Sequence, residues 1–446
     1  MPSSLSVQLI NQTNHSSVWA YITGLSLQKN SARVFVLPTS QLYYPPSPSK
    51  ILQPLPVDPS IPLGPPGAIT TITIPPIAGG RIWFSSHRPL TFFLNPNGPG
   101  GGAALVEPSV LNPSDVNSGV DFAFCEFTLN AAQLFANITY VDFVPRLPVA
   151  LTLRTVRGEV QHVSGMGVDG LDRVCEGLRE QSRRDGRPWE KLVVRDRNPG
   201  QGGRELRALS PTHGAEVGAR FDGYFEPLVD KVWEKYRERE REEVQLQQQQ
   251  PQSQHHHHER RGLFGFLHHM TGGGGSGSGS GGGGGGGGGN GYGTTMLKIN
   301  TQAGPGIVAG CVGKTGDDLV FGGEKFCRPT TADILGCNSG PFTTGPSPTR
   351  NAIIPRLAAA FQRGCILDVA EHPSPPHTFY RRDPTNHYAR IVHECNLDGK
   401  GYAFAYDDVQ PDGGADQSGK VNAGDPTVFI VSVGGGRAYV GDTMPY

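Results

Sequence analysis

Short runs of β-branched and aromatic residues recur through residues 5–155, and clusters of Pro, Gly, Asn and Ser separate them. The runs are VWAYITGL, ARVFVL, ITTITI, RIWFSS, LTFFL, DFAFCEFTL, FANITYVDF and VALTLRT. Short strands at regular spacing with such punctuation are typical of a sandwich or a barrel. The 62 glycines and 38 prolines among 446 residues agree with a fold that has many turns. The sequence therefore predicts a mainly β architecture for its first third.

The spacing of apolar residues changes after residue 169. One stripe recurs at steps of three and four residues, between Asp169 as a possible cap and Gly186 as a stop, and consists of Leu171, Val174, Cys175 and Leu178. A second helical stripe follows in FEPLVDKVWEKYRERE, and a third helix is predicted in PRLAAAFQRGCI. Strand character is predicted for MLKIN, KGYAFAYDDV and TVFIVSVGG.

These patterns divide the chain into three segments. We expect residues 1–155 to form the first part of a β domain and residues 156–394 to form a mixed α/β domain. Residues 395–446 then return strands to the β domain. A glutamine, histidine and glycine tract over 240–294 interrupts the α/β domain, and we expect this insert to be disordered because it has little apolar surface to bury. Its histidines 255–258 are more typical of a low-complexity tract or a purification handle than of a metal site.

Charge and hydropathy exclude several classes of partner. The chain has 39 basic and 40 acidic side chains and no basic stripe, so we expect no nucleic-acid binding. It has no apolar run of 18 residues that could span a membrane. Its first residues, MPSSLSVQLINQTNHSS, lack the features of a secretory signal, whereas glycosylation triplets at Asn11, Asn14 and Asn137 favour export.

The seven cysteines contain no C-x-x-C pair, which weakens any zinc-ribbon interpretation. We expect disulfides of a secreted protein among four of them, Cys311, Cys327, Cys337 and Cys365. No metal site is predicted. Because the number of cysteines is odd, at least one thiol is left unpaired within the chain.

Common nucleotide-binding and hydrolase motifs are either unsupported by their surroundings or absent from the sequence. Gly165, Gly167 and Gly170 match G-x-G-x-x-G, but the preceding QHVS is polar and no βαβ unit follows, so we interpret them as a turn. The histidine-rich segments contain no H-E-x-x-H, and no serine lies in G-x-S-x-G.

Two acidic residues on neighbouring predicted strands are the strongest chemical signal. With a period of two, Glu126 shares one face of its strand with Thr128 and Asn130, and Asp142 lies on the returning strand. Glycoside hydrolysis needs such a pair, one carboxyl to protonate the leaving oxygen and one to activate water or attack carbon. The neighbours Phe124 and Phe127 would partly desolvate Glu126, which suits a general acid.

Two alternatives stay open at this point. An acidic residue in a strand is often solvated at an edge or paired with arginine, and Arg146 and Arg154 are nearby candidates. The two carboxylates also share a face only if the hairpin pairs residues with an even index sum or contains a bulge.

Longer segments carry a resemblance to a known family. LVEPSVLNPSDVN, FCEFTLNAAQLFANITYVDFVPRLPVALTL, GLDRVCEGLREQ and GKGYAFAYDDV resemble glycoside hydrolase family 64, the endo-β-1,3-glucanases related to thaumatin-like proteins. The resemblance implies a mainly β fold in which a thaumatin-like β-barrel or sandwich and a mixed α/β domain flank a wide groove. It implies an enzyme that hydrolyses β-1,3-glucan with inversion and releases short oligosaccharides. A non-catalytic, glucan-binding or cell-wall-associated protein is the alternative.

The resemblance also assigns roles to residues. Glu126 in C-E-F-T corresponds to the general acid, and Asp142 in Y-V-D-F corresponds to the base that activates water. The substrate-binding residues that it implies are Asp115, Thr128, Asn130, Phe135, Thr139, Asp407 and Asp408. Inversion implies a carboxyl separation of about 6.5 to 9.5 Å. We expect no metal or organic cofactor, a monomer whose partner is the polysaccharide, and a secreted or wall-associated location.

Overall fold

The structure, a computed structural model, describes residues 4–97, 102–196, 203–248, 296–302, 306–312 and 317–435. The predicted insert at 240–294 lies outside the described residues from residue 249 onward, and so does the glycine-rich segment at 98–101.

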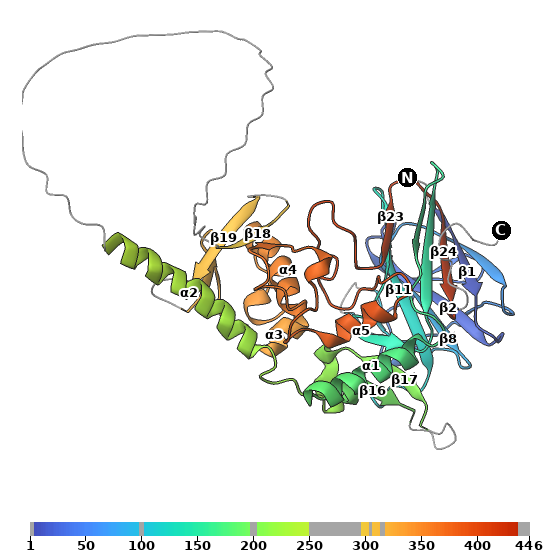
Figure 1. The fold of residues 1–446 in the computed structure, drawn as a ribbon. Helices are drawn as coiled ribbons and strands as arrows, with labels where there is room; N and C mark the ends of the chain where they lie inside the picture. Colours follow the sequence, from blue (N-terminus) through green and yellow to red (C-terminus); the bar gives the residue numbers. More distant parts are fainter. Residues whose placement is uncertain are drawn as a thin grey trace, which may run out of the picture.

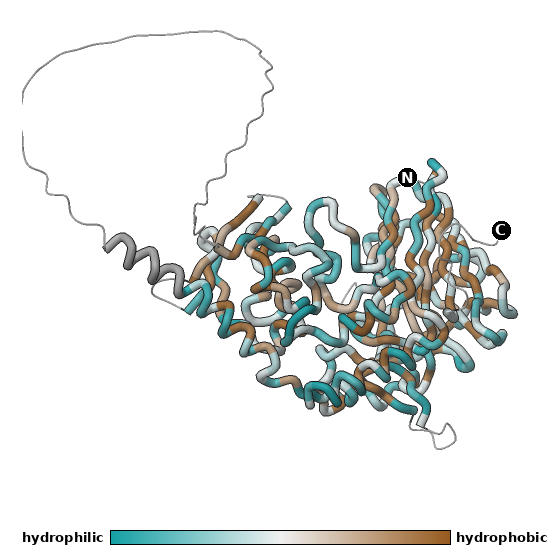
Figure 2. Tube along the Cα trace, in the orientation of Figure 1, coloured by the Kyte–Doolittle hydropathy of each residue, from teal (hydrophilic) through white to brown (hydrophobic). Residues whose placement is uncertain are grey.

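Two β-sheets share one hydrophobic core (Figure 1). The larger sheet contains, in order, β23 (Lys420–Ala423), β12 (Leu134–Ile138), β11 (Asp121–Leu129), β8 (Ile77–Ser86), β2 (Val18–Ser26), β3 (Ala32–Val36) and β4 (Leu42–Tyr43), and β6 (Ile61–Pro62) pairs with β2. The second sheet contains β15 (Val160–Val163), β14 (Val149–Thr155), β24 (Pro426–Val433), β1 (Leu5–Asn11) and β7 (Ile69–Ile74). Hydrophobic residues run through the strands of both sheets in Figure 2. The mainly β prediction is confirmed, whereas no closed barrel forms among the described residues.

Strands from both ends of the chain meet in the second sheet. β24 lies between β14 and β1, antiparallel to the first and parallel to the second. Val431 on β24 is fully buried and is the register partner of both Leu9 and Leu151. Residues 426–433 are therefore a central element of the sandwich.

Helices and smaller sheets form the rest of the described chain. The helices are α1 (Gly170–Asp185), α2 (Glu226–Gln248), α3 (Thr331–Gly336), α4 (Pro348–Gln362) and α5 (His387–Cys395). One small sheet contains β10 (Ala104–Val106), β9 (Phe93–Asn95) and β5 (Gln53–Pro54). Another contains β13 (Phe143–Pro145), β17 (Glu205–Leu209) and β16 (Val193–Arg195). A further sheet contains β21 (Glu324–Phe326), β20 (Leu319–Phe321), β19 (Ile307–Val312), β18 (Leu297–Asn300) and β22 (Glu371–His372). Across the described part of the chain, every helix is too short or too polar to pass through a bilayer.

The predicted helix after residue 169 is confirmed as α1. Its apolar stripe is buried, and Gly186 ends the helix in the left-handed region with φ of 69°. In that conformation the Gly186 N–H donates to the Ser182 carbonyl, which satisfies a terminal acceptor. Asp169 precedes the helix but makes no side-chain capping hydrogen bond.

Three sequence-based expectations are wrong. FANITYVDF is not one strand, because β12 ends at Ile138 and β13 begins at Phe143. KGYAFAYDDV is a turn-rich loop whose only bridge within the described chain joins Tyr402 to Thr139. The expected disulfides are not formed, since Cys327, Cys337 and Cys365 are free thiols.

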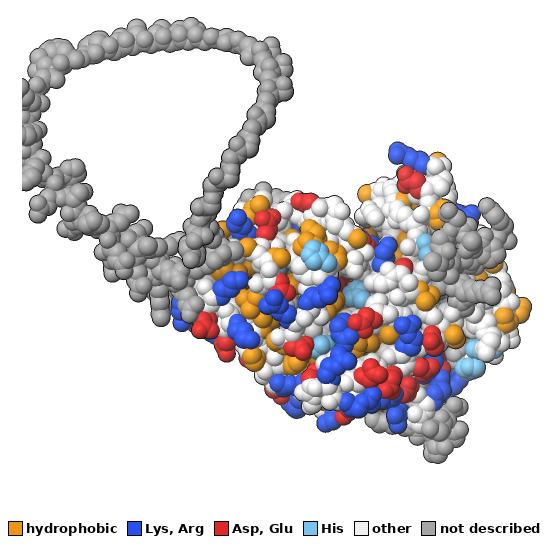
Figure 3. Space-filling view, viewed as in Figure 1, with side chains coloured by type: hydrophobic (Ala, Val, Ile, Leu, Met, Phe, Trp, Pro, Cys, Tyr) orange, Lys and Arg blue, Asp and Glu red, His pale blue; other side chains and the backbone are white. Residues whose placement is uncertain are grey.

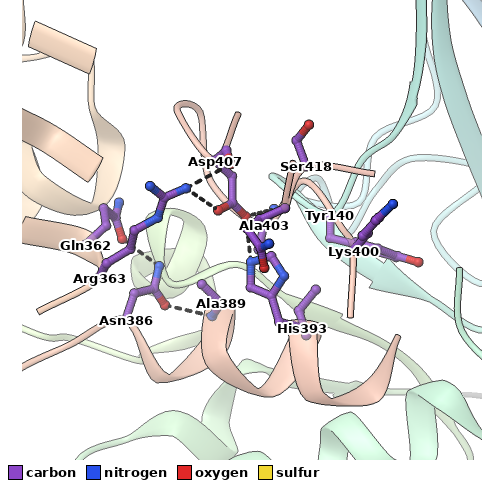
Figure 4. A network of polar contacts seen from close by, with 12 residues as sticks. Tyr140, Gln362, Arg363, Asn386, Ala389, His393, Lys400, Ala403, Asp407 and Ser418 are labelled. Carbon is purple, nitrogen blue, oxygen red and sulfur yellow. Dashed lines mark hydrogen bonds and ion pairs between the residues drawn. The ribbon is translucent and has the colours of Figure 1, made fainter. Parts of the chain in front are cut away.

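A buried charge network fixes that loop against α4 and α5 (Figure 4). The Asp407 side chain has no exposed surface, and its Oδ1 accepts from Arg363 Nη2 at 3.2 Å. Its Oδ2 lies 2.9 Å from His393 Nε2 and accepts the Ala403 N–H at 3.0 Å. Arg363 also donates to the carbonyls of Asp407 and Val409, so it binds both the side chain and the backbone of the loop.

The protonation states in this network follow from its acceptors. His393 Nδ1 lies 2.9 Å from the Gly399 carbonyl, and its Nε2 faces the carboxylate, so both ring nitrogens must carry hydrogen. Burial favours the neutral form of each group, but Asp407 outweighs it and raises the pKa of His393. His393, Arg363 and the Ala403 N–H likewise hold the pKa of Asp407 below its ordinary value despite burial. The network is therefore a charged imidazolium, carboxylate and guanidinium.

Asp407→Asn should destabilise the fold by about 3 to 5 kcal/mol, because it leaves two buried cationic groups without their anion. Urea denaturation of the folded chain measures this change. Glu394→Gln is the matched control, since Glu394 is 58% exposed in its pair with Arg390 and should contribute less than about 1 kcal/mol. Equal midpoints for the two variants would contradict the role assigned to the network.

The pH dependence of stability has a defined sign. The lowered pKa of Asp407 contributes stability that is present above its ordinary value of 3.8 and is lost as pH falls through the folded value. The raised pKa of His393 contributes stability below its ordinary value of 6.5 that is lost as pH rises through the folded value. Both contributions should be missing from the stability profile of Asp407→Asn.

Candidate active site

Glu126 forms an ion pair across two central strands. β11 pairs with β8 so that Glu126 lies opposite Arg81, and Glu126 Oε1 accepts from Arg81 Nη2 at 3.1 Å and from Nε at 3.2 Å. The Glu126 side chain is 39% exposed. The sequence left open whether the acidic residue is solvated at an edge or paired with arginine. Pairing with arginine is observed, but the partner is neither Arg146 nor Arg154.

The aromatic neighbours of Glu126 do not enclose it as the sequence suggested. Phe127 lies on the opposite face of β11, where its ring packs over Gly80 in the core; a Cβ at Gly80 would come within 2.5 Å of that ring. Phe124 shares the face of Glu126, but the Arg81 guanidinium lies over its ring at 4.7 Å. The expectation of an apolar pocket around the carboxylate is corrected to a charged, partly solvated one.

Asp142 lies in the bend between β12 and β13. The register partner of Glu126 on β12 is Asn137, so the index sum is odd, and a continuous strand would place Asp142 on the other face. The ladder ends at the pair of Cys125 and Ile138, and the bend frees Asp142 from that alternation. The charge of Arg81, which binds Glu126, also contributes to lowering the pKa of Asp142.

His213 is the direct partner of Asp142. It comes from the 3-10 helix Pro211–Val217, and its Nε2 lies 3.0 Å from Asp142 Oδ1. The Ser210 N–H also donates to the Asp142 carbonyl at 2.9 Å. The hydrogen bond with His213 lowers the pKa of Asp142, and the charges of His213 and Arg81 add to this effect against the opposing effect of burial. Asp142 is therefore an ionised carboxylate that keeps 47% of its side chain exposed.

Several implied contact residues share the face of Glu126. Thr128 and Phe135 are register partners, and both are partly exposed. Thr128 Oγ1 accepts the Gly79 N–H at 3.3 Å. Thr139 continues this side of the hairpin and bridges to Tyr402. These three residues form a surface that leads along the hairpin from Glu126.

Other implied contact residues have visible structural roles. Asn130 Oδ1 accepts the N–H groups of Ala132 and Gln133, so it shapes the hairpin turn. Asp115 accepts hydrogen bonds from Ser109 and Asn117 within its own loop.

Asp407 and Asp408, the two adjacent acidic residues of Y-D-D, have different environments. Asp407 is buried in the network described above and does not line an accessible surface. Asp408 is partly exposed. The nearby Tyr402 hydroxyl donates to the Ala405 carbonyl at 2.9 Å, and burial, together with the charge of Asp408, raises the pKa of Tyr402. The charge of Glu126 contributes to the same rise.

Sequence reasoning missed four residues of this site: Arg81, His213, Tyr402 and Glu107, which accepts a hydrogen bond from Arg81 Nη1. Arg81 lies in RIWFSS, whose composition indicates only a strand. Glu107 and His213 lie in segments without periodicity, and only the fold brings them to the hairpin. Tyr402 lies in a segment that was expected to be a strand.

The surface near the hairpin is hollowed. β11 and β23 lie on the side of the sandwich that faces α4 and α5 in Figure 1, and Figure 3 shows a depression between these two parts at the upper edge. A separate cavity of about 380 Å³ is lined by residues that include Arg88, Val110, Arg195, Arg207 and Glu216, and none of the predicted site residues lines it. Within the described ranges, no group of three or more His, Cys, Asp or Glu side chains is arranged to hold a metal ion.

Comparison with known proteins gives relatives of one kind. A glucan endo-1,3-beta-glucosidase of Cellulosimicrobium cellulans is 25% identical over 369 residues, which cover 81% of this chain and 53% of the relative. A glucan endo-1,3-beta-glucosidase of Arthrobacter sp. (strain YCWD3) is 24% identical with the same coverage. The chain thus spans about half the length of the curated relatives it matches.

Solved structures share the whole fold. A laminaripentaose-producing beta-1,3-glucanase, solved in complex with laminaritetraose, is 26% identical with a TM-score of 0.73, and the match covers 97% of this chain and 99% of that one. A beta-1,3-glucanase domain from Clostridium beijerinckii is 21% identical with a TM-score of 0.65, over 97% and 98% of the two chains, and supports the fold alone. The sequence pattern of the beta-1,3-glucanases of glycoside hydrolase family 64 matches residues 3–259 and 290–433. The resemblance seen in the hairpin motifs is therefore confirmed over most of the chain, which belongs to glycoside hydrolase family 64.

Proposed function

We propose that this protein hydrolyses β-1,3-glucan by an inverting mechanism in which Glu126 is the general acid and Asp142 the general base. The observation that supports this most directly is the setting of both carboxylates: each is partly exposed, and each is bound by one cationic or titratable partner, Glu126 by Arg81 and Asp142 by His213. The structural relative with laminaritetraose supports the same substrate class.

The reaction follows from the two roles. Glu126 donates its proton to the glycosidic oxygen as the bond from that oxygen to the anomeric carbon breaks. Asp142 accepts a proton from a water molecule whose oxygen forms the new bond to the same carbon from the opposite face. One water is consumed, and the anomeric configuration inverts.

The environment of Asp142 suits a base. The hydrogen bond from His213 and the nearby positive charges keep the carboxylate ionised to acidic pH. A base must be deprotonated to accept a proton, so these partners extend the pH range in which Asp142 can act.

We further propose that the glucan lies along the depression between the sandwich and the α/β region. This placement corresponds to a thaumatin-like arrangement in which residues 1–155 and 395–446, together with β15, supply one wall and the rest of residues 156–394 the other. Thr128 and Thr139 can hydrogen-bond sugar hydroxyls, and Phe135 offers an aromatic face to a pyranose ring. The protein would act as a monomer on glucan outside the cell or in a cell wall.

Glu126→Gln and Asp142→Asn should each lower kcat on laminarin by about 10² to 10⁴, since each removes one proton-transfer group. Release of reducing ends measures the rate. Glu180→Gln, an exposed residue of α1, should retain wild-type activity. Unchanged turnover in either site variant would remove that residue from its assigned role. A glucan-binding protein without catalysis, the alternative function, would show no turnover in any form while still sedimenting with insoluble glucan.

His213→Ala should move the acidic limb of the kcat/KM profile to higher pH, because Asp142 loses its hydrogen bond and a neighbouring charge. His213→Gln keeps a donor without a charge and should move the limb less. The measurement is the rate on a soluble laminari-oligosaccharide between pH 3 and pH 8. Superimposable profiles for wild type and His213→Ala would contradict the role of His213.

The first product released should be the α-anomer, because inversion at a β-linked carbon gives α configuration. Proton NMR during the first minutes of hydrolysis distinguishes the anomers before mutarotation mixes them. An initial β signal would replace inversion with retention and would make Asp142 a nucleophile.

A further inference from the structure

Arg81 holds two carboxylates, and only one of them has a role in the proposed reaction. Its Nε and Nη2 donate to Glu126, and its Nη1 donates to Glu107, which follows β10. The three side chains are 29%, 39% and 28% exposed for Arg81, Glu126 and Glu107. At this depth their charges interact more strongly than those of a fully solvated pair.

The cation alone would work against a general acid. A general acid must carry its proton when it meets the glycosidic oxygen, whereas an adjacent guanidinium favours the ionised carboxylate. Arg81 cannot leave easily, since it lies over the rings of Phe124 at 4.7 Å and Trp83 at 5.5 Å. Some other group must reduce its effect on Glu126.

Glu107 is placed to supply that reduction. It binds the same guanidinium on a different nitrogen, so its charge offsets the charge that Arg81 presents to Glu126. Its charge also acts on Arg33 of β3: burial lowers the pKa of Arg33, Glu107 opposes this change, and Arg81 adds to it. Glu107, Arg81 and Glu126 therefore form a row of alternating charges.

We propose that Glu107 is a positioning residue which shares Arg81 with Glu126 and thereby limits how strongly Arg81 holds the Glu126 carboxylate. The proposal rests on the function proposed above, in which Glu126 is the acid. It adds a residue that touches neither substrate nor reacting atoms and acts through Arg81.

Other charged and titratable groups face this row from the neighbouring elements. Tyr402 and Asp408 lie in the loop after α5, and the charge of Glu126 contributes to the raised pKa of Tyr402. Asp142, which is bound by His213, follows β12, and the charge of Arg81 contributes to its lowered pKa. From β12, the register partner is the uncharged Asn137. Among these groups, Glu107 is distinguished by its direct contact with the guanidinium that binds the acid.

The test is Glu107→Gln, which keeps the shape of the side chain and removes its charge. Arg81 then faces Glu126 alone and holds it more strongly as a carboxylate, so the basic limb of the kcat/KM profile should move to lower pH. The acidic limb, which reports Asp142, should move by less. Glu180→Gln is the control and should keep both limbs in place.

Arg81→Gln should shift the basic limb of the kcat/KM profile in the opposite direction. Without the cation, Glu126 and Glu107 repel each other and the basic limb should move to higher pH. The acidic limb should also move to higher pH, because Arg81 contributes to the lowered pKa of Asp142. Urea denaturation of each variant shows whether it is folded, and a structural defect alone would lower rates at every pH without moving the limbs.

A readout without turnover separates this proposal from the proposed function. Carbon-13 NMR of glutamate-labelled Asp142→Asn protein follows the titration of Glu126, whose signal is assigned by its loss in Glu126→Gln. Adding Glu107→Gln should lower the titration midpoint. An unchanged midpoint overturns the role of Glu107, whatever the activity. A wild-type protein without glucanase activity removes the proposed function and leaves this midpoint to decide the Glu107–Arg81–Glu126 linkage.

Discussion

The complete burial of the Asp407 carboxylate is the constraint on which the arrangement of the site depends. A buried carboxylate is stable only with charged, hydrogen-bonded partners, and here Arg363 at the end of α4 and His393 of α5 supply them. Their directions fix the loop that continues into Tyr402 and Asp408. Because Thr139 bridges to Tyr402 next to the bend of Asp142, the buried charge determines where the α/β region meets the hairpin.

The exposed carboxylates show the opposite balance. Glu126 and Asp142 keep access to water and are each held by one cationic or titratable partner, Arg81 and His213. Such pairs contribute little to stability in solvent, and in the proposed reaction their part is to hold the two carboxylates in place. The same residue types therefore support the fold at Asp407 and, in the proposed function, the chemistry at Glu126.

Local patterns predicted much of the architecture and the two central acids. The strand DFAFCEFTL coincides with β11, VALTLRT with β14, and the stripe from Leu171 to Leu178 with α1, because alternation and helical spacing are properties of neighbouring residues. The face of the hairpin on which Asp142 lies could not be predicted from local patterns. It depends on the odd register between β11 and β12 and on the bend at which this pairing ends. Arg81, Glu107 and His213 reach the site through pairings across 45, 26 and 71 residues, which no local pattern encodes. The aromatic pattern of KGYAFAYDDV suggested a strand, but the buried pairing of Asp407 holds that segment in turns.

The central place of β24 has a consequence for how the sandwich assembles. Without residues 426–433, the second sheet consists of two separate pieces, β1 with β7 and β14 with β15, each with an unpaired edge. During synthesis more than 250 residues separate β14 from β24, so these edges stay open while the intervening chain emerges. Protection of the nascent sandwich from intermolecular strand pairing thus depends on the arrival of one late segment, and its insertion is the step that joins the two halves of the sheet.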